Sequence, residues 1–318
     1  MISICIPAYR HVSFTHEAAI SILKQDVDIE LVVLDDFHTL ELTSENIYLV
    51  ESLREYLNSD RRVKCFSNER LLPIQDNWNK AVHLCSRDYI KLIGADDRLI
   101  DGSLARISKM ISAYPKIAFH GHLANVINET GVIIRQQRPY DNDLINQPIT
   151  GIAALKSKLR QKVRFKEPAC NFYQKKAWEE VGGYTKKYRF TFDIQFNTKL
   201  MYCYDSMLWN DYLVDLRRHS VSDGALLPAE LAFENLTSLV DEILNKLNQS
   251  ASKSDYLAAK GWIQYRLLEL TAQRFKTQPM ESIKFFVDNF NCIINNPVSL
   301  IWMAKLMSSK ILFNDIQQ

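Results

Sequence analysis

The feature that most constrains the fold is a repeated alternation of short apolar runs with helical patterns over the first hundred residues. Residues 2–6, 30–34, 63–66 and 89–93 read as buried strands, each ended by proline, glycine or a polar residue. Helical patterns separate them, with Ser44 as the expected cap of a helix over residues 44–57. Strands joined through helices form a mainly parallel sheet. We therefore expect an α/β fold with helices flanking the sheet.

The pattern changes twice along the rest of the chain. Residues 102–227 are mixed, with weaker strands expected near 117–122, 131–135 and 212–216. From residue 228 onward almost everything reads as helix, over 231–247, 256–275, 280–294 and 298–312. The sequence therefore predicts two regions, 1–227 and a C-terminal helical region over 228–318.

Polar residues follow three of the expected strands, namely Pro7-Ala8-Tyr9, Asp35-Asp36 and Asp96-Asp97. In a parallel sheet, ligands bind at the carboxyl ends of the strands. The adjacent carboxylates of Asp96 and Asp97 repel each other and favour a cation, and oxygen ligands suit Mg²⁺ or Mn²⁺. The alternative is a solvated turn in which one Asp caps the next helix.

Asp35-Asp36 has three interpretations. The pair could contact a ribose or base, it could begin a phosphatase-type Asp-X-Asp-X-Thr pattern, or it could form a turn. Phe37 stands where the phosphatase pattern requires an acid, which disfavours that interpretation. The chain has no glycine-rich dinucleotide motif and no P-loop. Gly182-Gly183 reads as a helix C-cap rather than a phosphate-binding loop.

Composition limits the class of protein. A formal net charge of +2 gives no reason to expect nucleic-acid binding. The six cysteines form no metal-binding spacing and read as reduced core residues. No apolar stretch approaches the roughly 18 residues of a membrane span, and no signal peptide opens the chain. We therefore expect a cytoplasmic protein, with association at the inner face of the membrane as an alternative.

Several segments together resemble the family 2 glycosyltransferases, whose fold is the GT-A type. They occur in that family's order along residues 1–225: 2–9 (Ile-Ser-Ile-Cys-Ile-Pro-Ala-Tyr), 31–36 (Leu-Val-Val-Leu-Asp-Asp), 77–81 (Asn-Trp-Asn-Lys-Ala), 88–92 (Asp-Tyr-Ile-Lys-Leu), 95–97 (Ala-Asp-Asp), 175–184 (Lys-Lys-Ala-Trp-Glu-Glu-Val-Gly-Gly-Tyr), 192–195 (Phe-Asp-Ile-Gln) and 217–222 (Arg-Arg-His-Ser-Val-Ser). The resemblance implies a GT-A catalytic domain over 1–227. It also implies sugar transfer from a nucleotide diphosphate sugar to an acceptor hydroxyl with inversion. We expect a UDP-linked donor, with GDP- and dTDP-linked sugars as alternatives.

The resemblance also implies roles for particular residues. Asp193 would be the catalytic base, and Mn²⁺ or Mg²⁺ would be the cofactor. The implied metal ligands are Asp96, Asp97 and His219. The implied nucleotide-sugar contacts are Pro7, Ala8, Tyr9, Asp35, Asp36, Asn79, Asp96, Arg218 and His219. The implied acceptor-side residues are Gly182, Gly183 and Tyr184.

The chain departs from the family's pattern at three places. Gly94 stands where the first acid of the metal-binding Asp-X-Asp is common, so metal binding would depend mainly on Asp96. Arg87 replaces the usual glycine before the fourth strand. Asp193 stands without the second acid often found beside the base.

Partners follow from the same resemblance. The expected partners are a nucleotide sugar donor and a glycan or lipid-linked acceptor of bacterial surface polysaccharide synthesis. Apolar residues of the last expected helix suggest either peripheral membrane contact or packing, including a homodimer through the C-terminal helices. These residues are Trp302, Met303, Leu306, Met307, Ile311 and Leu312.

Two other function classes remain open at this point. A nucleotidyltransferase that makes nucleotide sugars would need a glycine-rich basic loop after the first strand, and residues 7–11 contain no glycine. A non-catalytic binding protein with the same fold is kept open by Gly94.

Overall fold

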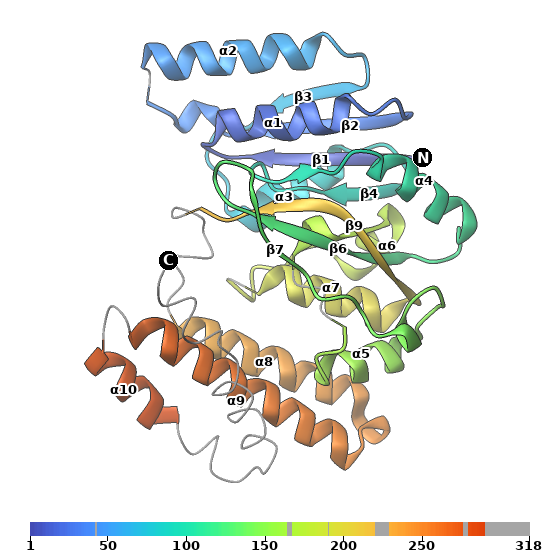
Figure 1. Ribbon diagram of the computed structural model, residues 1–318, viewed down its shortest axis with the longest axis vertical. Helices are drawn as coiled ribbons and strands as arrows, with labels where there is room; N and C mark the ends of the chain where they lie inside the picture. The colour runs from blue at the N-terminus through green and yellow to red at the C-terminus, as the bar shows by residue number, and fades with distance from the viewer. Residues whose placement is uncertain (42, 164–166, 190, 220–228, 276–278, 290–318) are drawn as a thin grey trace. The chain divides into compact units, whose positions relative to one another are not determined.

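The computed structural model describes residues 1–41, 43–163, 167–189, 191–219, 229–275 and 279–289. The chain divides into two compact units. Unit 1 consists of Met1–Gly151, Phe165–Lys187 and Phe192–Ser222, and unit 2 consists of Ile152–Arg164, Tyr188–Thr191 and Asp223–Gln318. Unit 1 is built around one sheet and unit 2 from helices (Figure 1).

The first four strands form the parallel half of the sheet. They are β1 (Ile2–Ala8), β2 (Ile29–Asp35), β3 (Val63–Ser67) and β4 (Tyr89–Leu92), arranged in the order β3-β2-β1-β4. The connecting helices are α1 (Val12–Leu23), α2 (Ser44–Asn58) and α3 (Ile74–Leu84). This alternation confirms the predicted α/β architecture, and it places the carboxyl ends of all four strands at one edge.

The other half of the sheet is mixed. Its strands are β5 (Arg98–Leu99), β6 (Phe119–Ile127), β7 (Ile133–Gln136), β8 (Asn171–Gln174) and β9 (Ser206–Arg217). Strand β8 pairs antiparallel with both β4 and β6, and β6 pairs parallel with β9. Strands β4, β6 and β9 therefore run in the same direction and end at the same edge.

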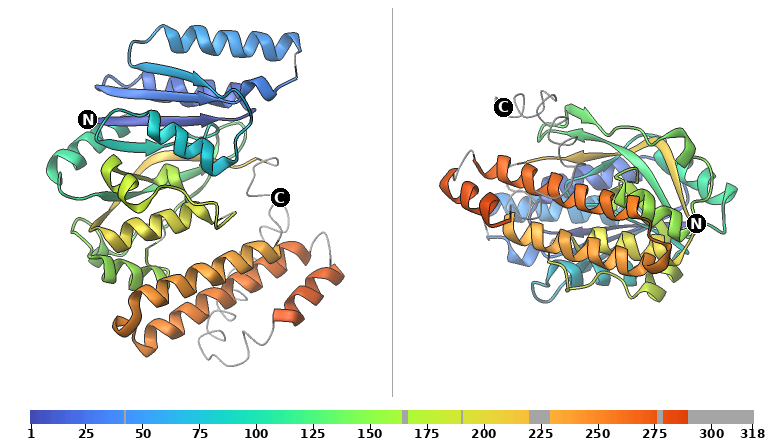
Figure 2. Two further views of the ribbon diagram at one scale, coloured as in Figure 1. Left: turned by 180° about the vertical axis from the view of Figure 1, so that it is seen from behind. Right: turned by 90° about the horizontal axis from the view of Figure 1, so that it is seen from below.

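The period-two alternation of β1 divides the core between the two faces of the sheet. Ile2, Ile4 and Ile6 belong to a cluster with α1, α2 and α4 (Ser103–Ala113). Cys5, which points the other way, lies against Cys85 at the end of α3. Figure 2 shows α3, α6 (Lys175–Val181) and α7 (Phe192–Cys203) on the face opposite α1. Both faces of β1, β2 and β4 are covered, which explains why these parallel strands are buried and largely apolar, whereas the edge strand β3 is partly exposed.

Some local predictions were wrong. The cap of α2 is Thr43 rather than Ser44, because Thr43 Oγ1 accepts the Asn46 backbone N–H at 3.1 Å. Strand β9 begins six residues before the expected start, and α4 and β8 were not expected. Cys65 and Cys203 are exposed rather than core residues. Cys292 lies outside the described residues.

Unit 2 contains α8 (Ala229–Leu247), α9 (Lys253–Phe275), α10 (Pro279–Asn289) and most of α5 (Gly151–Leu159). Its apolar core includes Phe233, Leu267 and Phe285. The buried carboxylate of Asp255 binds Arg160 at 2.7 Å and so ties α9 to the segment after α5. Within the described ranges, no helix combines the length and apolar character that a membrane crossing requires. The expected helix over 298–312, with its apolar face, lies outside those ranges.

Candidate functional site

The shared edge of the sheet brings together residues that are far apart in sequence. Tyr9 follows β1, Asp36 follows β2, Asp96 follows β4 and His219 follows β9. All four strands run in one direction, so their carboxyl ends meet at this edge. The topology therefore accounts for a polar site assembled from strand ends.

Asp96 and His219 are in direct contact. The Oδ2 atom of Asp96 lies 3.1 Å from Nε2 of His219, and their side chains are 28% and 3% exposed. The His219 ring packs edge-on against His11, with centroids 4.9 Å apart, and lies beside Phe14. Its Nδ1 atom is buried and has no hydrogen-bond partner. A partly exposed carboxylate thus faces a well-packed imidazole whose other nitrogen is unsatisfied.

Asp97 is oriented differently from its neighbour. It is 8% exposed, and its Oδ1 accepts the Arg217 backbone N–H at 3.0 Å. Burial, followed by the charge of Asp96, raises the pKa of Asp97 well above its usual value. Within the described chain, no three His, Cys, Asp or Glu side chains are arranged to hold a metal ion. Of the predicted trio, Asp96 and His219 are in direct contact, whereas Asp97 Oδ1 is held by the Arg217 backbone.

Gly94 makes room for these carboxylates. A Cβ atom at this position would lie 2.7 Å from Oδ1 of Asp96 and 2.9 Å from Oδ2 of Asp97. Both distances are shorter than a normal contact. The glycine at position 94 is therefore matched to the present positions of Asp96 and Asp97.

The Asp96–His219 pair fits a divalent cation. A carboxylate oxygen and an imidazole nitrogen are both ligands that Mn²⁺ accepts, and Mg²⁺ prefers the oxygen. Two adjacent ligands of an octahedral ion, each at about 2.1 Å, are separated by about 3 Å. The 3.1 Å between Oδ2 and Nε2 agrees with that spacing. Two protein ligands are sufficient for ions that complete their coordination with phosphate oxygens and water.

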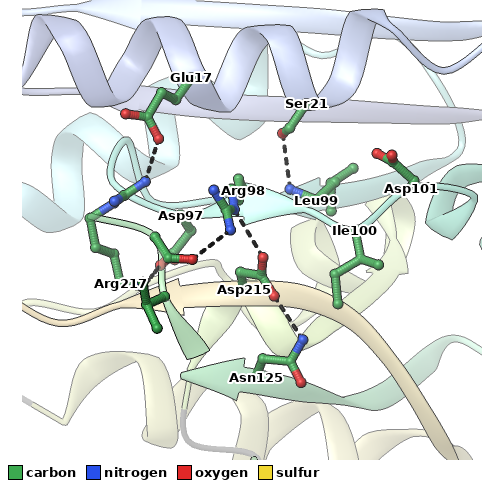
Figure 3. A network of polar contacts seen from close by, with 12 residues as sticks. Glu17, Ser21, Asp97, Arg98, Leu99, Ile100, Asp101, Asn125, Asp215 and Arg217 are labelled. Atoms are coloured by element: carbon green, nitrogen blue, oxygen red, sulfur yellow. Dashed lines mark hydrogen bonds and ion pairs between the residues drawn. The ribbon is translucent and has the colours of Figure 1, made fainter. Parts of the chain in front are cut away.

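Arg217, from the basic segment 217–222, is buried under this pair. Its side chain is 1% exposed. Nε donates to the Asp96 carbonyl at 2.9 Å. One terminal nitrogen binds Glu17 Oε2 at 2.5 Å, as Figure 3 shows. The other donates to the Glu129 carbonyl, while the guanidinium lies over the Phe14 ring, 4.4 Å from its centroid. Arg217 is therefore unavailable to a phosphate.

Arg218 and His219 line an open pocket of about 490 Å³. Asn128, Glu129 and Thr130, in the turn between β6 and β7, form the rest of its lining. The half-exposed Arg218 side chain forms an ion pair with Glu167 at 2.7 Å. The pocket thus adjoins the Asp96–His219 pair and has a cationic side.

Asp35 and Asp36 have separate surroundings at the end of β2. Asp35 accepts bonds from the Phe37 backbone N–H at 3.2 Å and the Ser67 hydroxyl at 2.8 Å, which hold the strand end in place. Asp36 Oδ1 accepts from Asn68 Nδ2 at 3.0 Å, and Asn68 Oδ1 accepts from Lys80 at 2.7 Å. Burial raises the pKa of Asp36. Asp36 is therefore the member of the pair within a polar network that extends to α3.

Pro7 and Ala8 contribute to the same region through the end of β1. The Ala8 carbonyl accepts the Asp36 backbone N–H at 3.0 Å, so β1 and the residue after β2 are joined directly. Tyr9 follows, and the Arg10 guanidinium lies 4.7 Å from its ring centroid. Arg10 has a φ of 63°, which turns the chain sharply from β1 into α1.

The predicted acceptor-side residues form a tight turn after α6. Gly182 ends the helix in the left-handed conformation, which confirms its predicted role as C-cap. Gly183 also has positive φ. Both backbone groups of Tyr184 bind the Asn79 side chain, one as donor and one as acceptor, each at 2.8 Å. Asn79, expected at the nucleotide sugar, therefore holds this turn on α3.

Asp193 lies in the first turn of α7, next to this turn. Its Oδ1 accepts the Ile194 backbone N–H at 2.8 Å. Burial raises the pKa of the Tyr184 hydroxyl, and the nearby charge of Asp193 adds to the effect. Trp78 packs edge-on against both Tyr184 and Phe192. The predicted base is thus partly exposed at the border of an aromatic cluster.

The sequence interpretation missed several residues of the site. Asn68 and Lys80 connect Asp36 to α3, Glu17 pairs with Arg217, and Glu167 pairs with Arg218. Asn68 directly follows the β3 strand, so its position at a strand end could have identified it. The two glutamates have no such signal, because their arginine partners are distant in sequence.

Comparison with known structures agrees with this architecture. The structure of S. aureus TarS 1-349 in complex with UDP-GlcNAc matches 96% of this chain and 80% of that one, with a TM-score of 0.58 and 16% identity. Mannosyltransferase PcManGT from Pyrobaculum calidifontis, in complex with GDP-Man and Mn²⁺, matches 99% and 87%, with a TM-score of 0.57 and 13% identity. The match covers only 44% of the longer TarS structure. At these identities the likeness shows a GT-A fold.

Sequence comparison is more specific. A curated relative, "Uncharacterized protein MT1568" of Mycobacterium tuberculosis (strain CDC 1551 / Oshkosh), is 29% identical over 110 residues, which are 34% of this chain and 32% of the relative. The pattern of Glycosyl transferase family 2 matches residues 3–182, more than half of the chain. The ends of β1, β2 and β4 and both acidic pairs fall within that match, and the chain belongs to glycosyl transferase family 2.

Proposed function

We propose that this protein is an inverting glycosyltransferase that moves a sugar from a UDP-linked donor to an acceptor hydroxyl. The observation that carries the proposal is the 3.1 Å contact between Asp96 and His219, at the same sheet edge as Asp36. A cation-binding pair and a polar nucleoside network on one edge suit a nucleotide diphosphate donor. The similar structures bound to UDP-GlcNAc and to GDP-Man with Mn²⁺ support this class of donor.

The nucleoside would bind along the ends of β1 and β2. Asp36 would accept a hydrogen bond from the base or ribose, with its orientation fixed by Asn68. Pro7 and Tyr9 would pack against the nucleoside. Burial of the Asp36 carboxylate strengthens each hydrogen bond made there, because the local dielectric constant is low.

Asp96 and His219 would hold Mn²⁺ or Mg²⁺. When bound, the ion neutralises charge on the diphosphate leaving group. Arg218 borders the adjoining pocket and would add a second positive charge next to the phosphates. Asp97 would stay outside the coordination, since Arg217 occupies its Oδ1.

Asp193 would act as general base and take the proton from the acceptor hydroxyl as that oxygen attacks the anomeric carbon. The bond to the diphosphate breaks in the same step, and the configuration inverts. Gly182, Gly183 and Tyr184 would form the acceptor side. We propose a growing surface glycan or a lipid-linked sugar as the acceptor.

The test is a donor screen with the purified full chain. UDP-, GDP- and dTDP-sugars are incubated with Mn²⁺, with Mg²⁺ or with a chelator, and both released products and binding are measured. The proposal expects nucleoside diphosphate release from a UDP-sugar that requires the metal. Pyrophosphate release would instead indicate a nucleotidyltransferase.

Binding distinguishes an inactive transferase from a non-catalytic protein. A transferase that lacks its acceptor should still bind UDP in the presence of the metal. This binding raises the thermal midpoint, because the ligand binds only the folded state. If UDP gives no shift with Mn²⁺ and GDP or dTDP does, the UDP assignment is wrong. If none of the three shifts the midpoint, the proposed function fails.

A further inference from the structure

We propose that Arg217 is the positioning residue that keeps Asp96 and His219 at metal-binding distance. The proposal rests on the proposed metal role of that pair. According to this proposal, one buried arginine sets the distance between two metal ligands that come from opposite halves of the sheet.

The first argument is that Arg217 contacts both sides of the pair. Its Nε donates to the Asp96 carbonyl at 2.9 Å, and its backbone N–H donates to Asp97 Oδ1 at 3.0 Å. These two bonds fix the segment that carries Asp96. His219 lies two residues after Arg217, the last residue of β9. Fixing Arg217 therefore also fixes the backbone from which the His219 side chain extends.

The second argument is that the contacts require the guanidinium group. Three different nitrogens of Arg217 reach the Asp96 carbonyl, the Glu129 carbonyl and Glu17. Lysine retains the charge but has a single nitrogen, so it cannot make these three contacts from one place. The guanidinium also lies over Phe14, whose ring in turn packs beside His219. Replacing Arg217 would therefore disturb both the loop and the packing of the imidazole.

The third argument comes from a second arginine with a different set of contacts. Arg98 binds Asp215 at 2.9 Å and the Gly131 carbonyl at 3.0 Å (Figure 3). It thus holds the same β6–β7 turn as Arg217, through Asp215 and Gly131 rather than through Asp96 or His219. Arg98→Lys is therefore a matched control for the loss of a guanidinium fork in this region.

The experiment measures Mn²⁺ affinity by titration calorimetry in the presence of UDP, together with the thermal midpoint of each variant. Arg217→Lys should weaken Mn²⁺ binding by roughly 10–100-fold, the usual effect of losing a residue that orients a ligand. Arg98→Lys should lower the midpoint yet leave Mn²⁺ affinity within about twofold. Asp96→Asn should abolish the Mn²⁺ binding that the wild type shows.

The outcomes separate this inference from the proposed function. If Asp96→Asn abolishes Mn²⁺ binding while Arg217→Lys and Arg98→Lys both retain it, the positioning role of Arg217 is wrong. If the wild type binds no Mn²⁺, or Asp96→Asn binds it normally, the metal role of the pair fails and this inference fails with it. If Arg217→Lys does not fold, Glu17→Ala replaces it, because it removes one partly exposed partner. That variant should lose about threefold in Mn²⁺ affinity, and an unchanged affinity would overturn the inference.

Discussion

The carboxylate of Asp96 and the imidazole of His219 lie 3.1 Å apart although 123 positions separate them in the chain. They meet because β4 and β9 run in the same direction and end at one edge of the sheet. The sheet topology therefore brings the pair together. A small displacement of the end of either strand should change the affinity of the proposed metal site.

Gly94→Ala should weaken Mn²⁺ binding by about tenfold, because the new Cβ atom would lie 2.7 Å from Asp96 Oδ1 and must displace it. Asp97 is fixed by Arg217, so much of the displacement falls on Asp96. Titration with Mn²⁺ measures the effect, and the thermal midpoint in chelator is the control, because it reports the folding of the variant without the metal. Unchanged Mn²⁺ affinity would show that the loop absorbs the methyl group without moving Asp96.

Asp193→Asn should reduce the rate of sugar transfer by roughly 10²–10⁴-fold, the contribution of a general base. Binding of UDP and Mn²⁺ should be unchanged, because the assigned donor contacts lie elsewhere. Initial rates at saturating donor check this, with Asp205→Asn as the control for an exposed carboxylate just after the same helix. Full transfer by Asp193→Asn would exclude the base assignment.

Gly183→Ala should destabilise the protein more than Gly182→Ala. Both glycines have positive φ, so each substitution costs about 1–2 kcal/mol in backbone strain. Only at Gly183 does the new Cβ also approach Asn79 Oδ1, at 2.6 Å. We expect a further 1–3 kcal/mol or so in urea unfolding, and a raised KM for the acceptor. Equal losses at both positions would mean that Asn79 moves aside freely.

His120 should make the stability fall on acidification. Burial lowers the pKa of His120 to about 4 from its ordinary 6.5. Between these values the unfolded chain binds the proton and the folded chain does not, so the free energy of unfolding decreases as pH falls through this window. The effect amounts to about 3 kcal/mol. Above pH 6.5 the contribution is fully present.

Urea unfolding from pH 7 to pH 4 tests this, with His120→Asn as the non-titrating variant. The difference between wild type and variant should shrink as pH falls. Trp209→Phe is the control, because it removes the Trp209 bond to His120 Nδ1 and leaves the titrating ring in place. Parallel curves for wild type and His120→Asn would show that another group causes the acid sensitivity.

Local sequence pattern was sufficient for the parallel half of the sheet. The runs ending before Pro7, Asp35 and Gly94 are short and apolar. Each is a strand in the structure, although β1 continues through Pro7 to Ala8 and β2 through Asp35, and each places its polar successor at the same edge. The topology follows from the alternation with helices, so the common location of Asp36 and Asp96 could be expected before the fold was known.

The roles of individual polar residues could not be predicted in this way. Arg217 and Arg218 are identical neighbours in sequence, yet one is buried against backbone carbonyls and the other lines a pocket. Asp96 and Asp97 also differ in their contacts, since Asp96 faces His219 and Asp97 binds the Arg217 backbone N–H. Those differences depend on which loops approach the end of β9, a tertiary property with no local pattern. Lys91 shows the same limit: its nitrogen is satisfied by the Ala169 carbonyl, far along the chain.

Helix α3 carries two consecutive side chains that serve different parts of the site. Asn79 holds the Tyr184 backbone, and Lys80 reaches the Asn68 amide that binds Asp36. A shift of this helix must therefore alter both ends at once. For the donor and acceptor sites proposed above, thermodynamic linkage then requires reciprocity: the factor by which the donor changes acceptor affinity through α3 equals the factor by which the acceptor changes donor affinity. Binding of one substrate should therefore change the dissociation constant measured for the other.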